Sequence, residues 1–176
     1  ATAVINGGVF KAPEGAPALK GAEKTGNPII YGGTFSSDVS KYVAENAAIT
    51  EGPDGTFTVN ELDETNGVAE VGGRYYASLQ NAVANAGKGE TVTLLQNTAE
   101  DIVIPERAEL TLNLNGKTLT NQENHTITNK GTLTITGDGT VDNVTHARAA
   151  IQNEPGGNVV LNGGAYTRRK ENGQHA

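Results

Sequence analysis

Several residue types are missing or scarce in this chain of 176 residues, and each absence narrows its chemistry. There is no cysteine, which excludes disulfide bonds, thiol catalysis and cysteine-bound zinc. Methionine and tryptophan are also missing, and aromatic residues make up only 5 %, so the core has to be built from Val, Ile, Leu and Ala. No apolar run approaches the ~18 residues that a membrane-spanning helix needs.

Positive charge is scarce as well. The 13 Lys and Arg residues are outnumbered by 20 Asp and Glu residues, which gives a net charge of −7. Nucleic acids and anionic membrane surfaces are bound by clusters of basic residues, and the single dense basic run here is Arg168-Arg169-Lys170. We therefore expect no nucleic-acid partner and no membrane insertion.

Glycine, in contrast, is abundant, and it recurs in a motif. A branched apolar residue is followed by any residue, a glycine and, soon after, another apolar residue; the copies lie at residues 5–10, 30–35, 114–119, 135–141 and 161–166. Their starts are 25 residues apart in the first pair, then 21 and 26 apart in the last three. A period of this size is typical of a solenoid, in which each coil buries its apolar face against its neighbours. We predict an all-β, right-handed parallel β-helix (β-solenoid) whose coils run strand, glycine corner, strand.

The chain is expected to contain parts of two modules. Residues 1–50 read as the last coils and the cap of one module, with a closing segment at 36–44 in which Ser36, Ser37 or Asp38 caps a short helix. Residues 51–67 are rich in turn-forming and acidic residues and are predicted to be a joint. Residues 68–176 read as the N-terminal cap and first coils of a second module. Because position 1 is not Met and no closing segment precedes residue 176, we expect the chain to begin and end inside modules.

The second module is predicted to open with a hairpin and a helix. The hairpin turns at Gly72-Gly73, and Ser78 caps a short α-helix near residues 78–86 whose apolar residues form one stripe: Leu79, Ala82, Val83 and Ala86. Two asparagines further on, Asn129 and Asn153, fall at the same corner of successive coils. We weigh an amide ladder between them against two unrelated turn residues.

Five phrases of the sequence resemble repeated modules of large cell-wall-associated surface proteins of Gram-positive gut bacteria. They are residues 75–83 (YYASLQNAV), 89–95 (GETVTLL), 112–119 (LNLNGKTL), 129–135 (NKGTLTI) and, as a module ending, 32–43 (GGTFSSDVSKYV). The resemblance implies display at the bacterial cell surface and an adhesin-like role. The expected partners are a host surface protein, such as mucin or an immunoglobulin, or a glycan, together with neighbouring modules.

Catalysis is the main chemical alternative, because parallel β-helices also include pectate-lyase-like and polygalacturonase-like enzymes. Such enzymes need clustered carboxylates, and the candidates are Asp138 and Asp142 with Glu100 and Asp101. Asp138 follows a corner glycine, where Asp is a common turn residue, and the matching place in the next coil is Gly164. We therefore expect no enzyme activity and no catalytic residues.

Metal and cofactor sites are not indicated by the sequence either. The histidines share no metal-ligand spacing: His125, His146 and His175. The acidic residues of 51–64 lack the ordered spacing of a calcium loop and read as a solvated linker. We expect neither a metal nor a cofactor.

Recognition remains as the predicted function. Tyr and Arg are favoured interface anchors, and we expect four such residues to be exposed in the last corner loop: Tyr166, Arg168, Arg169 and Lys170. A rigid sheet of Thr, Asn and Gln side chains suits a glycan or a protein edge. The competing interpretation is a structural spacer whose faces are only solvated.

Overall fold

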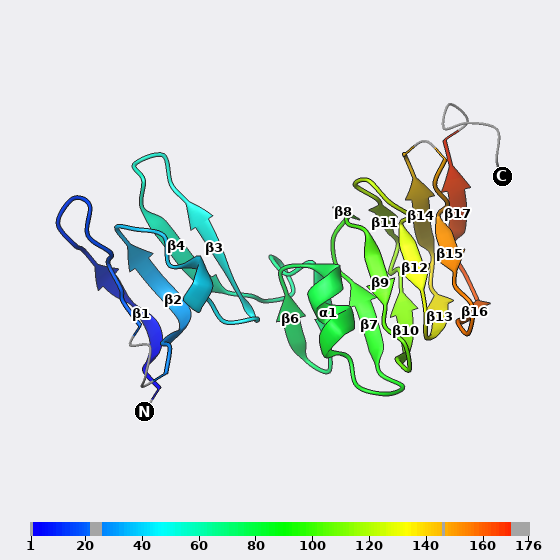
Figure 1. Ribbon diagram of the computed structural model, residues 1–176, viewed down its shortest axis with the longest axis horizontal. Helices are drawn as coiled ribbons and strands as arrows, with labels where there is room; N and C mark the ends of the chain where they lie inside the picture. The colour runs from blue at the N-terminus through cyan, green and yellow to red at the C-terminus, as the bar shows by residue number, and fades with distance from the viewer. Residues whose placement is uncertain (1, 22–25, 146, 170–176) are drawn as a thin grey trace. The chain divides into compact units, whose positions relative to one another are not determined.

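The computed structural model describes residues 2–21, 26–145 and 147–169, and it confirms the predicted fold. The chain is a parallel β-solenoid built mainly from short strands, with one short α-helix (Figure 1). It divides into two compact units, unit 1 (Ala1–Asp63) and unit 2 (Glu64–Ala176). Each unit has its own hydrophobic core.

Unit 2 contains the regular coils. Each coil contributes one strand to each of three parallel sheets, so that strands three apart in the sequence pair with each other. The strands are β7 (Thr91–Leu94), β8 (Thr98–Ala99), β9 (Ile102–Ile104), β10 (Glu109–Asn113), β11 (Lys117–Thr120), β12 (Ile127–Asn129), β13 (Thr132–Thr136), β14 (Gly139–Asn143), β15 (Ile151–Asn153), β16 (Asn158–Leu161) and β17 (Ala165–Arg168).

The core of unit 2 consists of apolar residues at matching positions of successive coils. Leu112 lies between Val92 and Ile135 in the parallel ladder, and all three side chains are fully buried. The alternation of strands places every second residue inside, as predicted for Leu110, Leu112 and Leu114. Each coil therefore buries its inner face only when a neighbouring coil covers it.

The N-terminal side of unit 2 is closed as the sequence predicts. β5 (Ala69–Val71) and β6 (Arg74–Tyr76) form an antiparallel hairpin that extends the sheet of β7. α1 (Leu79–Asn85) follows, and Ser78 Oγ accepts a hydrogen bond from the Asn81 amide at 3.1 Å. Leu79, Ala82 and Val83 are buried against the first coil.

Of the two alternatives for Asn129 and Asn153, the structure shows the amide ladder. Asn129 Nδ2 donates to Asn153 Oδ1 at 2.7 Å, and the two residues are register partners in β12 and β15. The Asn129 amide is fully buried and also bonds the carbonyl oxygens of Gly131 and Asn158 at 3.2 and 3.0 Å. It satisfies backbone groups at the corner that would otherwise be buried without partners.

Unit 1 is a smaller four-stranded sheet in the order β1-β2-β4-β3. It consists of β1 (Val4–Phe10), β2 (Ile29–Phe35), the 3₁₀ helix η1 (Ser40–Tyr42), β3 (Ala47–Glu51) and β4 (Phe57–Glu61). β1 and β2 pair in parallel, as coils do, whereas the β3–β4 hairpin lies antiparallel on β2 and ends the stack. The Phe10 and Phe35 rings stack at a centroid distance of 4.9 Å.

Two expectations for unit 1 need correction. The glycine motif was expected to form corners, but β1 and β2 each run through it as a single strand. β4 pairs with β2 from Gly33 to Phe35, which keeps β2 extended past its glycines. The closing segment forms a 3₁₀ helix without a side-chain N-cap bond, although Asp38 accepts a bond from the Ser40 amide at 2.8 Å. Val39 and Tyr42 of this segment are buried in the core of unit 1.

The predicted joint at residues 51–67 is only partly a connection. Its middle forms β4, which belongs to the sheet of unit 1. The boundary between the two units falls after Asp63, inside the predicted range.

Candidate binding surfaces

A polar trough on the sheet of unit 1 is the strongest candidate for a binding site. Its volume is about 530 Å³, within the range of small-molecule sites. The lining residues come from three adjacent strands: Asn6, Tyr31, Gly32, Gly33, Val59, Asn60 and Glu61. Except for Val59, none of these side chains belongs to the core of unit 1.

Irregular strand pairing shapes this trough. Ile5 pairs with Ile30 and Asn6 with Gly32, so Tyr31 is the extra residue of a β-bulge. A bulge redirects a side chain from its regular alternation. Gly32 lines the trough and has no side chain to fill it. A Cβ at this position would lie 2.8 Å from the Asn6 carbonyl oxygen. The glycine is therefore needed for the close approach of β1 and β2.

The polar groups of the trough are accessible. Asn6, Asn60 and Glu61 are exposed and Tyr31 is half-buried. No hydrogen bond to another described residue engages the side chains of Asn6, Tyr31 or Asn60, whereas Glu61 Oε1 accepts a bond from Asn46 Nδ2 at 3.4 Å. Two amides and a carboxylate can donate and accept hydrogen bonds around one ring-sized ligand. The Tyr31 ring adds an apolar wall with a polar tip.

The residues predicted as binding anchors lie elsewhere, in the last coil of unit 2. Tyr166 and Arg168 are in β17 rather than in a corner loop, and strand alternation places both half-buried on its inner face. Arg169 is exposed, and its Nε lies 3.9 Å from Asp142 Oδ2. Lys170 lies outside the described residues. The expectation of a fully exposed loop was therefore wrong for Tyr166 and Arg168.

A second hollow lies at this last coil. It measures about 350 Å³ and is lined mainly by apolar residues: Ala149, Ala150, Ile151, Leu161, Tyr166, Thr167 and Arg168. The Tyr166 hydroxyl is turned back to the Gly163 carbonyl oxygen at 2.7 Å, and burial raises the pKa of this tyrosine. The hollow lies at the interior face of the coil, because the register partners of Ile151, Leu161 and Tyr166 one coil earlier are fully buried.

Two of the candidate catalytic carboxylates, Glu100 and Asp101, accept hydrogen bonds from backbone amides. Glu100 accepts hydrogen bonds from the Leu79 and Gln80 amides at 2.9 and 3.0 Å, at the start of α1. Asp101 accepts bonds from the amides of residues 122–124 at 2.9–3.3 Å. Burial raises the pKa of Asp101, but these hydrogen bonds lower it more, so that its pKa lies below the ordinary value. Both carboxylates therefore hold adjacent segments together.

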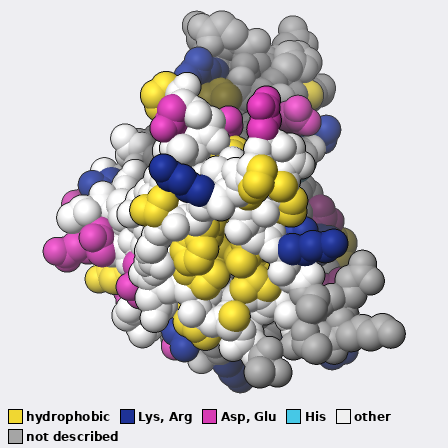
Figure 2. All heavy atoms as spheres, turned by 90° about the vertical axis from the view of Figure 1, so that its left-hand side faces the viewer, with side chains coloured by type: hydrophobic (Ala, Val, Ile, Leu, Met, Phe, Trp, Pro, Cys, Tyr) yellow, Lys and Arg dark blue, Asp and Glu magenta, His cyan; other side chains and the backbone are white. Residues whose placement is uncertain are grey.

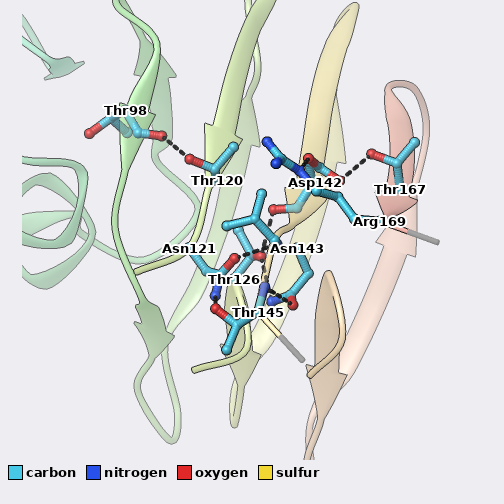
Figure 3. A network of polar contacts seen from close by, with 10 residues as sticks. Thr98, Thr120, Asn121, Thr126, Asp142, Asn143, Thr145, Thr167 and Arg169 are labelled. Carbon is cyan, nitrogen blue, oxygen red and sulfur yellow. Dashed lines mark hydrogen bonds and ion pairs between the residues drawn. The ribbon is translucent and has the colours of Figure 1, made fainter. Parts of the chain in front are cut away.

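Asp142 belongs to a polar network along the sheet of β11, β14 and β17 (Figure 3). It accepts a bond from Thr167 Oγ1 at 2.8 Å, in addition to the contact with Arg169. Beside it, Asn121 Nδ2 donates to Thr145 Oγ1 at 2.5 Å, and Asn143 Nδ2 donates to Thr126 Oγ1 at 3.2 Å. Asn121 and Asn143 are both buried. This is a second polar ladder, which the sequence analysis missed; the alignment of Asn121 with Asn143 was the available signal.

The remaining carboxylate and the histidines add no site. Asp138 is exposed at a corner. His125 Nδ1 accepts a bond from the Ala149 amide at 2.9 Å, and His146 and His175 lie outside the described residues. Among the described residues, no group of three or more His, Asp or Glu side chains could hold a metal ion. None of the described helices is long and apolar enough to cross a membrane.

No family model matches the chain, and no curated protein or solved structure is significantly similar to it.

Proposed function

We propose that this chain is a non-catalytic, adhesin-like binding module of a bacterial cell-surface protein. Its ligand is a glycan, carried by a host glycoprotein such as mucin or an immunoglobulin. The observation that supports this proposal is the polar trough of unit 1, in which exposed amides and a tyrosine ring surround a floor of glycines. The resemblance of the sequence to surface-protein modules gives the proposed location.

The chemistry of the trough favours a sugar over other small ligands. A sugar ring has hydroxyl groups around its edge, which the amides of Asn6 and Asn60 and the carboxylate of Glu61 can bond. Its faces carry C–H groups that can lie against the Tyr31 ring. The trough has no basic residue among its lining residues, which disfavours a phosphate ligand.

A structural spacer is the second candidate function. Two sets of internal polar contacts fix the corners of unit 2: the Asn129–Asn153 hydrogen bond, and the bonds of Asn121 with Thr145 and the Val144 amide. Stacked coils of this kind make a stiff element. An adhesin needs both a binding surface and a stiff structure, and binding experiments distinguish a binding module from a spacer alone. The enzyme alternative loses support because Glu100 and Asp101 already bond backbone amides.

The test is binding of the purified chain to a glycan array and to immobilised mucin and immunoglobulin at physiological salt. We expect saturable binding to one glycan class, weakened at least about tenfold by Tyr31→Ala or Asn60→Ala, which is about 1.4 kcal/mol. Tyr75→Ala is the matched control, since Tyr75 is a half-buried tyrosine of β6, outside the trough.

Two other results would change the conclusion. Saturable binding that is lost with Arg169→Ala but kept with Tyr31→Ala would move the site to the last coil of unit 2. No binding by the folded chain to any of these surfaces would contradict the binding proposal and favour the spacer.

A further inference from the structure

Negative charge dominates unit 1, the part of the chain that contains the trough. Its residues 1–63 include eight Asp or Glu, four Lys and no Arg, so the formal net charge is −4. Figure 2 looks onto unit 1 from the side of β1 and shows hydrophobic side chains at its centre, with the visible Lys and Arg side chains scattered around them. An anion that approaches unit 1 therefore meets a field of its own sign.

Glu61 brings this charge into the trough. Of the described residues that line the trough, Glu61 is the only charged one, and the others are Asn, Tyr, Gly and Val. Glu61 is the last residue of β4, where it pairs with Ala47 of β3. The neighbouring Asn46 donates from Nδ2 to Glu61 Oε1 at 3.4 Å. This bond orients the carboxylate and leaves its negative charge in place, because an amide is neutral.

The lysines of unit 1 do not line the trough. Lys11 and Lys20 belong to the segment between β1 and β2, and Lys24 lies outside the described residues. Lys41 Nζ lies over the Tyr42 ring, 4.7 Å from its centroid. Carboxylates and phosphates are usually bound by Arg or Lys, so an acidic sugar finds no cationic partner among the lining residues.

A neutral sugar fits the same groups without repulsion. Its hydroxyl groups can donate hydrogen bonds to the Glu61 carboxylate and accept them from the amides of Asn6 and Asn60. A sialic acid or a uronic acid adds a carboxylate, which Glu61 repels more strongly the closer it lies. A site can discriminate between ligands by such repulsion as well as by attraction.

We infer that the trough selects neutral glycans over acidic ones, and that Glu61 is the residue that determines this specificity. The inference rests on the glycan binding proposed above and adds the chemical class of the ligand. On a glycoprotein, the preferred chains end in neutral sugars, and a terminal sialic acid masks them.

The first test compares matched ligands with the full chain. The glycan array carries each chain with and without a terminal sialic acid, and mucin is compared before and after enzymatic removal of sialic acid. We expect the neutral member of each bound pair to bind at least about fivefold more tightly at physiological salt. The preference should shrink at about 1 M salt, because exposed charges are then screened.

The second test uses variants of matched charge. Glu61→Gln removes the charge and keeps the size of the side chain, so the preference should fall below about twofold. Glu51→Gln is the control and should keep the preference. It changes the net charge equally, but Glu51 is exposed at the opposite end of the β3–β4 pair, outside the trough. Asn60→Asp adds a second carboxylate to the trough and should increase the preference at least about twofold, which covers the case in which Glu61→Gln binds no glycan.

The outcomes separate this inference from the proposed function. Equal binding of neutral and acidic chains, or tighter binding of the acidic ones, keeps the glycan proposal and overturns the inference. A preference that Glu61→Gln leaves intact, or that Glu51→Gln also removes, overturns the role of Glu61. No binding to either member of any pair contradicts the proposed function and this inference with it.

Discussion

The same glycine motif behaves differently in the two units. In unit 2 it turns the chain from one sheet into the next, with left-handed residues at Asn115 and Gly116 (φ 49° and 72°) and at Gly164 (φ 77°). In unit 1, Gly8 and Gly33 have φ angles of 111° and 130°, and the strands continue. The motif therefore specifies a place where the chain can bend, and the neighbouring strands decide whether it does.

The neighbour that decides in unit 1 is β4. It pairs antiparallel with Gly33, Thr34 and Phe35, so β2 gains ladder bonds by continuing past its glycines. Within the described residues of unit 2, no such hairpin lies along the parallel coils, and the chain turns to enclose the core. As a result, the bulged strands of unit 1 leave a trough, whereas amide side chains fill corners of unit 2.

The largest expected effect comes from comparing a residue in a coil with neighbours on both sides, Leu133, with a residue in the last coil, Leu161. Leu133 is fully buried between neighbouring coils, so Leu133→Ala should lower the free energy of unfolding by about 2–5 kcal/mol. Leu161 lies in the last coil, two residues after Val159, the register partner of Leu133, and it is 48 % exposed, so Leu161→Ala should cost less than about 1 kcal/mol. Chemical denaturation of dilute protein measures both values. Equal losses would mean that the last coil is as closed as the others.

The second comparison sets a buried asparagine of unit 2, Asn129, against an exposed asparagine of unit 1, Asn60. Asn129 makes several buried hydrogen bonds, and Asn129→Ala would leave corner carbonyls without partners, at a cost of about 2–3 kcal/mol. Asn60 is exposed in the trough, so Asn60→Ala should change stability by less than about 0.5 kcal/mol while weakening glycan binding. Thermal unfolding and the binding assay on both variants decide this. A destabilised Asn60→Ala protein would make the trough asparagine structural.

The glycines test the comparison directly. A Cβ on Gly139 would lie 2.7 Å from Leu114 Cβ, and the φ of 141° is unfavourable for other residues. Gly139→Ala should therefore destabilise unit 2 by about 1–2 kcal/mol. Gly7 has no atom within 4 Å of its Cβ position, so Gly7→Ala should be nearly neutral. If Gly7→Ala were the more harmful change in a denaturation experiment, the view that the motif is less constrained in unit 1 would fail.

Much of the fold could be predicted because solenoid coils repeat in the sequence. The alternation of Leu110, Leu112 and Leu114, the Ser78 cap and the Asn129–Asn153 spacing are local or periodic signals, and each matches the structure. Stacking depends on such repetition, so a pattern seen once constrains every coil.

The trough could not be predicted in the same way. Its residues lie on β1, β2 and β4, and Tyr31 is placed by a bulge that depends on pairing with β1. The antiparallel return of β4 breaks the repeat, so the period of the motif contained no information on it. Tyr166 and Arg168 were misplaced for a related reason, because the β17 strand continues after the corner and turns them inward.

The smallest expected effect concerns pH and the contact between coils at Asp101. Its folded-state pKa lies below the ordinary value of 3.8, since the hydrogen bonds from the amides of Gln122, Glu123 and Asn124 outweigh burial. The ionised carboxylate therefore stabilises the fold above pH 3.8, and this contribution disappears as the pH falls through the lower folded-state value. Asp101→Asn should reduce stability at neutral pH by at most about 1 kcal/mol, because the site is partly solvated, and the difference from wild type should vanish in acid. Denaturation at several pH values, with the exposed corner residue varied as Asp138→Asn for comparison, measures this. A difference that persisted unchanged at low pH would show that Asp101 acts through packing and not through its charge, so that this corner of unit 2 would depend on shape and not on an ionised group.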